Sequence, residues 1–221
     1  MRVDMHMHTM WSGDATTTPD ELVGAVQETG IDVLCITDHG TTNGAFRLRD
    51  DLAAVGCRVV VGQEVRTWAG EVIGLFLTER LPHGLKPEEA VAAIRGQGGL
   101  VYVPHPFDPM RSCLRESVLV ELVEAGAVDA VEVFNAKTSL SHLNELAASL
   151  ADRHGLARGA GSDAHEPTAI GAAYVEVPSF DVGDAGSFLS ALRSSSARVV
   201  GHHYDAPRQW RPRIVPSTKA T

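Results

Sequence analysis

The chain has 221 residues, of which 44% are hydrophobic and 21% charged, an ordinary composition for a globular protein that buries one sizeable core. Its formal net charge of −9 argues against a basic surface that would bind nucleic acid. The N-terminus lacks a signal-peptide pattern and no apolar run approaches the ~20 residues that cross a bilayer, so we expect a cytoplasmic protein without a membrane partner.

Strand-like apolar runs alternate with helical patterns along the chain. The expected strands are residues 2–8, 31–37, 57–62, 71–77, 99–103, 129–134, 157–161, 173–177 and 197–200. The expected helices are residues 19–29, 43–55, a helix that starts at 87, 116–125, 140–154 and 185–194. This alternation predicts an α/β fold in which helices cover parallel strands. We expect one barrel domain, residues 1–205, followed by a loose tail, residues 206–221.

Local signals support the first expected helix. Thr18 is placed as its N-cap, Pro19 as its first helical residue and Gly30 as the residue after its end.

The first expected strand carries Asp4, His6 and His8. Because side chains alternate faces along a strand, these three should share one face. Imidazole together with carboxylate suits Zn, Mn or Fe, and two histidines two residues apart can bind one ion. The alternative is an ordinary pair of half-buried histidines.

Histidine and acidic residues also close, follow or lie in the later expected strands. They are Asp38, His39, Glu64, His105, Glu132, Asp163 and His165. In parallel α/β barrels the C-terminal ends of all strands meet on one face. Each residue alone has a structural alternative, such as a helix cap or a loop turn. Together they predict a metal site at that face.

Five motifs resemble, in the same order, those of the PHP (polymerase and histidinol phosphatase) family. They are Asp4-Met5-His6-Met7-His8-Thr9, Thr37-Asp38-His39, Gly62-Gln63-Glu64, Pro104-His105-Pro106 and Gly161-Ser162-Asp163-Ala164-His165. The resemblance covers residues 2–203. It implies a distorted (β/α)7 TIM-like barrel with a trinuclear site of Mn, Fe or Zn at the C-terminal ends of its strands, and a metal-dependent phosphoesterase activity.

The resemblance also implies a ligand set. One metal would be bound by His6, His8, Glu64 and Asp163, and Glu64 would bridge to a second metal that His105 also binds. The remaining ligand of the second metal stays open, between the regions of Asn135 and His142.

The third metal would be bound by Asp14, His39 and His165. Asp14 stands where some branches of the family have histidine, and its carboxylate should favour Mn²⁺ or Fe²⁺. The alternative for Asp14 is an Asx-turn within its loop. Asp4 and Asp38 are expected as outer hydrogen-bond partners of the ligands.

Clustered divalent cations can activate water at neutral pH and neutralise phosphate charge, so a Ser or Cys nucleophile is not required. We expect Asp163, His165 and His203 to take part in catalysis, with His165 or His203 helping the leaving oxygen to depart. The substrate phosphate should contact a cation, and the candidates are Arg111, Arg66 and Lys137, each shortly after a strand-end motif.

The sequence therefore predicts a metal-dependent phosphoesterase that acts on a small-molecule phosphate ester, either a monoester or a diester. One alternative is an amidohydrolase-like enzyme that hydrolyses a C–N bond. Another is a non-catalytic, metal-stabilised module associated with a polymerase. The identity of the substrate and the oligomeric state stay open.

Overall fold

The computed structural model describes residues 1–138 and 140–204, in which strands and helices alternate. The strands are β1 (Arg2–Met7), β2 (Val33–Ile36), β3 (Arg58–Thr67), β4 (Gly70–Leu75), β5 (Leu100–Val103), β6 (Ala130–Asn135), β7 (Ala157–Gly161), β8 (Ala173–Glu176) and β9 (Arg198–Gly201). The helices are α1 (Pro19–Thr29), α2 (Asn43–Ala54), α3 (Pro87–Gly96), α4 (Glu116–Glu124), α5 (Ser141–His154) and α6 (Ala185–Leu192), with short 3-10 turns η1 (Met10–Ser12) and η2 (Pro167–Ala169). The predicted tail, residues 206–221, lies outside the described residues.

The start of α1 follows the chemistry of its sequence. The Thr18 hydroxyl accepts a hydrogen bond from the Glu21 N–H, and the Glu21 carboxylate accepts one from the Thr18 N–H in return. This reciprocal capping box satisfies amide groups that the first helical turn leaves free. Gly30 then ends the helix with a φ of 66°, a left-handed conformation that glycine adopts at little cost.

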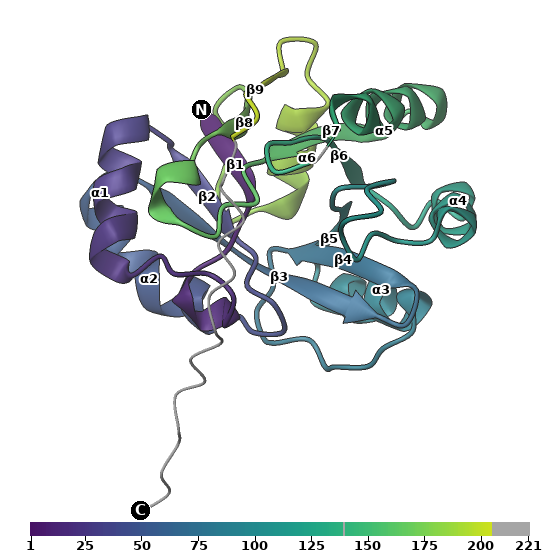
Figure 1. Cartoon of the computed structure of the whole chain (residues 1–221), viewed down its shortest axis with the longest axis horizontal. Coiled ribbons are helices and arrows are strands. Elements are labelled where there is room, and N and C mark those ends of the chain that lie inside the picture. The colour runs from purple at the N-terminus through teal and green to yellow at the C-terminus, as the bar shows by residue number, and fades with distance from the viewer. Residues whose placement is uncertain (139, 205–221) are drawn as a thin grey trace, which may run out of the picture.

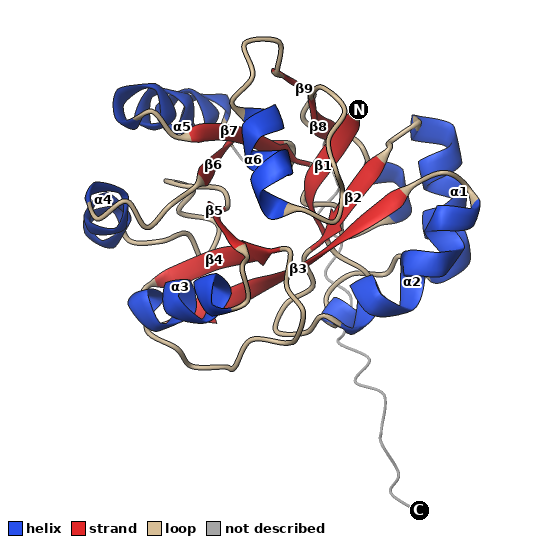
Figure 2. Ribbon diagram, turned by 180° about the vertical axis from the view of Figure 1, so that it is seen from behind, coloured by secondary structure: helices blue, strands red, loops and turns tan. Residues whose placement is uncertain are grey.

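The described strands form one sheet in the order β7-β6-β5-β4-β3-β2-β1-β8-β9. The sheet curls into a nearly closed barrel with helices around it (Figures 1 and 2), which confirms the expected α/β barrel class. The expectation that the strands are all parallel is wrong. Strand β4 runs antiparallel to β3 and β5, and β8 runs antiparallel to β1 and β9.

The hairpin of β3 and β4 explains one of these reversals. Only Trp68 and Ala69 separate the two strands, and so short a link cannot hold the crossover that parallel strands need. Pairing with β4 also extends β3 to Thr67, beyond the expected end at residue 62. Glu64 therefore lies within a paired strand and not in a loop after it.

Two hydrophobic cores lie on the two sides of the sheet. The outer core joins the barrel wall to α1–α5 through residues such as Leu34, Leu48 and Ile94. The inner core fills the barrel and includes Met5 and Tyr102. Phe188 of α6 packs into the inner core, so this helix covers one end of the barrel (Figure 2).

Strand β1 does not alternate regularly. Its register against β2 shifts between Asp4, which pairs with Leu34, and Met7, which pairs with Ile36. As a result Met5 packs in the inner core whereas Met7 packs in the outer one. The expectation that Asp4 shares a face with His6 and His8 is wrong, because the extra residue of this bulge reverses the alternation between them.

The segment after β7 closes the barrel against β1. The Asp163 N–H donates to the His6 carbonyl at 2.7 Å, and the His8 N–H donates to the Ala164 carbonyl at 2.9 Å. Gly161 makes this approach possible, since a Cβ at that position would clash with the His6 side chain. The closure brings residues about 155 positions apart in the sequence to the same end of the barrel.

Candidate metal centre

Four donor atoms from three segments meet at this end of the barrel. The Nε2 atoms of His6 and His8 lie 3.1 Å apart, and both lie within 3.3–3.5 Å of Glu64 Oε2 and within 3.5–3.8 Å of Asp163 Oδ1. All four residues are buried. Ligand atoms about 2.0–2.1 Å from a tetrahedral zinc ion lie about 3.3–3.4 Å from each other, so the spacing of these atoms fits one shared metal ion.

The other ring nitrogens of the two histidines have protein partners. His6 Nδ1 lies 3.1 Å from the Glu132 carboxylate, and His8 Nδ1 lies 3.1 Å from Ser12 Oγ. Such outer contacts are typical of metal-binding histidines, because they fix the tautomer and direct the Nε2 lone pair inward.

Glu64 joins this group to its neighbours. Its Oε2 lies 3.1 Å from His39 Nδ1, and its Oε1 lies 3.0 Å from His105 Nε2. The Glu71 carboxylate of β4 lies 3.8 Å from the same His105 nitrogen. Two groups of donor atoms close enough to share an ion therefore lie beside the first, namely His6, Glu64 and His105, and His39, Glu64 and Glu71.

Glu71 is a candidate ligand that the sequence reasoning missed. It lies in the expected strand of residues 71–77, to which no ligand was assigned. The hairpin register that places Glu71 opposite Arg66 is a feature of the folded structure. The sequence left the remaining ligand of the second metal open between the regions of Asn135 and His142, and the structure places these two residues differently. The Asn135 amide donates to Glu132 and Asp163, and His142 is exposed on α5.

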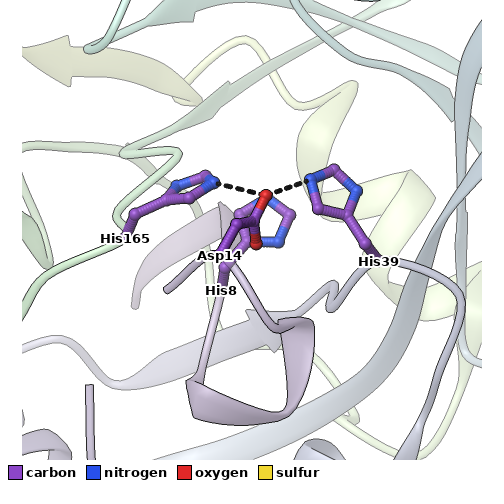
Figure 3. Close-up of side chains that lie close together, drawn as sticks. All are labelled: His8, Asp14, His39 and His165. Carbon is purple, nitrogen blue, oxygen red and sulfur yellow. Dashed lines mark ion pairs between the residues drawn. The ribbon is translucent and has the colours of Figure 1, made fainter. Parts of the chain in front are cut away.

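A third group lies nearer the surface (Figure 3). Asp14 Oδ2 lies 3.2 Å from His39 Nε2 and 3.6 Å from His165 Nε2, and the His8 ring lies behind them. Asp14 retains 39% of its side-chain exposure. Its carboxylate points to the two imidazoles as the predicted third site requires.

The charges of these groups depend strongly on one another. Burial opposes the positive charge of His39, but hydrogen bonding to Asp14 and the nearby Glu64 carboxylate raise its pKa to about 9. Burial and the neighbouring His165 lower the pKa of His8 to about 3, so its imidazole is neutral and can donate a lone pair. Burial, with the Glu64 charge beside it, raises the pKa of Glu71 to about 7.

Two candidate ligands have unusual backbone conformations. The φ angle is 29° at His105 and 50° at Asp163, in the left-handed region that residues other than glycine seldom adopt. Such strain persists only where surrounding contacts hold it, and it is concentrated at functional sites.

An open cavity of about 170 Å³ lies over the three groups. It is lined by Asp14, His39, Glu64, Arg66, Glu71, His105, Met110, Arg111, Ser112, Asp163 and His165. Two cations reach Asp163 at 3.8 Å, namely Arg111 through Nη2 and Lys137 through Nζ. Lys137 Nζ also lies 2.7 Å from His165 Nδ1. Arg66 pairs with Glu71 and is 73% exposed, so it lies at the rim.

Two predicted outer partners have structural contacts of another kind. Asp4 accepts hydrogen bonds from the backbone N–H groups of His6, Ser162 and Gly171, and the imidazole of His6 bonds to Glu132 instead. The Asp38 carboxylate accepts from the N–H and the hydroxyl of Thr9, at 2.6 and 2.7 Å.

His203 is placed differently from the other predicted catalytic residues. Its ring stacks on Phe134 and its Nδ1 lies 3.4 Å from the Ala136 carbonyl. It is not among the described residues that line the cavity. A catalytic role for His203 stays a prediction without geometric support.

The fold and the cluster define an α/β barrel with a buried group of imidazoles and carboxylates at one end. Residues 4–148 match the family model described as PHP domain, and residues 141–197 match the model described as PHP-associated. The chain belongs to the PHP domain family.

A relative resembles the chain in sequence, and solved structures resemble it in fold. An uncharacterized protein of Methanocaldococcus jannaschii is 38% identical over 147 residues, which cover 62% of this chain and 82% of that protein. A two-domain protein from Bacteroides vulgatus, described as containing a predicted PHP-like metal-dependent phosphoesterase, has a TM-score of 0.74 at 19% identity over 91% of this chain and 65% of its own. A lesion-specific endonuclease from Pyrococcus furiosus has a TM-score of 0.62 at 15% identity over 90% of this chain and 57% of its own.

No helix in the described part of the chain has the length and apolarity needed to span a bilayer.

Proposed function

We propose that the protein is a metal-dependent phosphoesterase that hydrolyses a small-molecule phosphate ester. The observation that carries this proposal is the environment of Glu64, one buried carboxylate whose two oxygens lie within 3.5 Å of four imidazoles. These belong to His6, His8, His39 and His105. Burying four imidazoles around one carboxylate costs free energy unless a cation accepts the lone pairs of these groups.

We assign the candidate ligands to three ions. The first would be held by His6, His8, Glu64 and Asp163. The second would be held by Glu64, Glu71 and His105, and the third by Asp14, His39 and His165. The mixture of imidazole and carboxylate suits Mn, Fe or Zn. When bound, such ions lower the pKa of water and neutralise the charge of a phosphate under attack.

The residues of the chain itself would position the substrate. Arg111 is the first candidate to bind the phosphate, since its guanidinium lines the cavity and is only 24% exposed. Lys137 Nζ and His165 Nδ1 lie 2.7 Å apart, and a proton held between them is available to the leaving oxygen. Asp163 would keep the side chains of Arg111 and Lys137 in place through its negative charge. Burial raises the pKa of Asp163, but the positive charges of Lys137 and His6 outweigh that effect and hold the pKa well below its usual range.

The test is an assay of the protein supplied with Mn²⁺, Fe²⁺ or Zn²⁺ against p-nitrophenyl phosphate, bis-p-nitrophenyl phosphate and a panel of phosphorylated metabolites. We expect release of phosphate or alcohol that stops when a chelator is added. Hydrolysis of amide or cyclic amide substrates alone would favour the amidohydrolase-like alternative. A loaded protein that turns over none of these substrates would favour the non-catalytic module.

A small-molecule partner and a cytoplasmic location belong to the same proposal. The net charge of −9 supports the first, because a long polyanion would be repelled by the acidic surface.

A further inference from the structure

The segment after β9 lies against the turn that follows β7. The His202 N–H donates to the Ala172 carbonyl at 2.9 Å, and the Tyr204 N–H donates to the Ala136 carbonyl at 3.3 Å. Tyr204 is half-buried, and its side chain packs against both hydrophobic cores. The PHP-associated family model matches the chain only as far as residue 197, so Tyr204 lies outside that match.

The hydroxyl of Tyr204 is bonded to the backbone of a candidate ligand. It donates to the main-chain carbonyl of Asp163 at 3.0 Å, across 41 positions of the sequence. The φ angle of Asp163 is 50°, and a residue other than glycine keeps such a conformation only where surrounding contacts hold it. The Tyr204 hydroxyl is one of those contacts.

The same carbonyl also contacts His165, whose Nδ1 lies 2.9 Å from the Asp163 oxygen. Because a carbonyl oxygen can only accept, this contact requires a hydrogen on Nδ1 and leaves the lone pair on Nε2. The Nε2 atom faces Asp14 at 3.6 Å, where the third ion is proposed (Figure 3). The Asp163 carbonyl therefore favours the His165 tautomer that can bind an ion.

The side chain of Asp163 extends from this turn to the proposed site of the first ion. Its Oδ1 lies 3.5 Å from His8 Nε2 and 3.8 Å from His6 Nε2. A rotation of the peptide after Asp163 would move this carboxylate and the His165 imidazole together. One hydroxyl is thus placed to act on candidate ligands of two ions.

We infer that Tyr204 is a positioning residue of the metal centre, whose hydroxyl holds the Asp163 carbonyl so that Asp163 Oδ1 and His165 Nε2 are directed to their ions. The inference rests on the metal binding that the proposed function requires. Tyr204 is not among the described residues that line the cavity, so it acts through these two ligands. Loss of a contact that orients a ligand typically lowers metal affinity about 10–100-fold.

The test is Tyr204→Phe, which keeps the ring and removes only the hydroxyl. Titration of the metal-free protein with Zn²⁺ against a chromophoric chelator measures the metal affinity, and thermal unfolding without metal measures the stability of the fold. We expect the affinity for at least one ion to fall about tenfold or more. The melting temperature of the metal-free protein should fall by no more than about 4 °C. Activity lost at limiting Mn²⁺ should return at saturating Mn²⁺.

Tyr174→Phe is the matched control. Tyr174 of β8 is also half-buried, and the Arg2 guanidinium lies 5.6 Å from the centroid of its ring. Within residues 1–138 and 140–204, the Tyr174 hydroxyl makes no hydrogen bond to a candidate ligand. Its substitution should leave the metal affinity unchanged.

Three results would overturn the inference. They are wild-type metal affinity in Tyr204→Phe, an equal loss of affinity in Tyr174→Phe, and a metal-free Tyr204→Phe protein that no longer unfolds cooperatively. The last result would assign the hydroxyl to the stability of the fold and not to the positioning of ligands.

Failure of the proposed function is distinguishable from failure of this inference. A wild-type protein that binds ions but hydrolyses no phosphate ester refutes the phosphoesterase, and the affinity of Tyr204→Phe still decides the role of the hydroxyl. A wild-type protein that hydrolyses phosphate esters, together with unchanged affinity in Tyr204→Phe, keeps the function and refutes the inference. A wild-type protein that binds no ion refutes both.

Discussion

The Nε2 atoms of His6 and His8 face each other at 3.1 Å in a fully buried part of the barrel. At most one proton can lie between them, and the carboxylates of Glu64 and Asp163 approach the same point. Several like dipoles and lone pairs directed at one small volume are stable only with a cation there. This relationship motivates the first prediction.

We expect the purified protein to carry more than one transition-metal ion per chain. The reason is that three donor sets share Glu64 or lie next to it. Elemental analysis after mild purification measures the stoichiometry, and thermal unfolding before and after chelation measures the stabilisation by metal. Less than one equivalent after supply of Mn, Fe or Zn, together with an unchanged melting temperature on chelation, would refute this prediction.

The second prediction concerns Asp14. Its Oδ2 lies between His39 and His165, so Asp14→Ala should remove one ion and most activity. Asp14→His should retain the ion and shift its preference toward Zn²⁺, because imidazole is the softer ligand. Asp51→Ala, at an exposed position of α2, is the control. Full metal content and wild-type turnover in Asp14→Ala would instead assign the carboxylate to the loop turn.

The third prediction concerns Glu132, which orients ligands from beneath the cluster. Its carboxylate bonds to His6 Nδ1, to the His105 N–H at 2.6 Å and to the Asn135 amide at 2.9 Å. Glu132→Gln keeps the size but loses the charge that fixes the His6 tautomer. We expect a loss of about 10–100-fold in metal affinity, measured by competition with a chromophoric chelator.

Glu124→Gln, at the exposed end of α4, should leave this affinity unchanged. Wild-type affinity in Glu132→Gln would show that backbone contacts alone position His6.

The fourth prediction distinguishes the three cationic side chains that could bind the substrate phosphate. Arg111→Ala should lower kcat/KM for a phosphate ester by about ten- to a hundredfold, corresponding to roughly 1.5–3 kcal/mol for a lost charge-assisted hydrogen bond. Metal content should stay intact. Arg66→Ala should have the smaller effect, because the Arg66 side chain is largely exposed. Arg47→Ala, on the exposed face of α2, controls for a change in net charge. Unchanged kinetics in Arg111→Ala would move the phosphate contact to Lys137.

The fifth prediction is a pH dependence of metal binding. Burial opposes protonation of His39, but hydrogen bonding to Asp14 and the charge of Glu64 raise its pKa to about 9 in the metal-free protein. Below pH 9 an incoming ion must therefore displace a proton. The apparent affinity should rise with pH, by up to about tenfold per unit for one proton, and level off above pH 9.

Calorimetry in buffers of different ionisation enthalpy measures the released protons. Affinity that falls or stays constant between pH 6.5 and 8.5 would contradict the raised pKa of His39.

The sequence by itself determined the class of the fold and most of the residues that meet at the cluster. Helix caps such as Thr18, the apolar runs of the strands and the motifs that follow them are local features. They depend on neighbours a few residues away, and each predicted ligand except the uncertain one of the second metal lies beside its cluster partners in the structure. The ends of the elements agree with expectation within two residues, except for the extended end of β3.

Only the tertiary structure decided the partners of these residues. Asp4 is turned away from the histidines by the bulge in β1, and its carboxylate bonds to the Ser162 N–H, 158 residues away. Glu71 reaches His105 through the register of the β3–β4 hairpin, and Glu132 reaches His6 across the closed barrel. Strand register and barrel closure are set by packing and hydrogen bonds between distant segments, for which periodicity and spacing within a segment carry no signal.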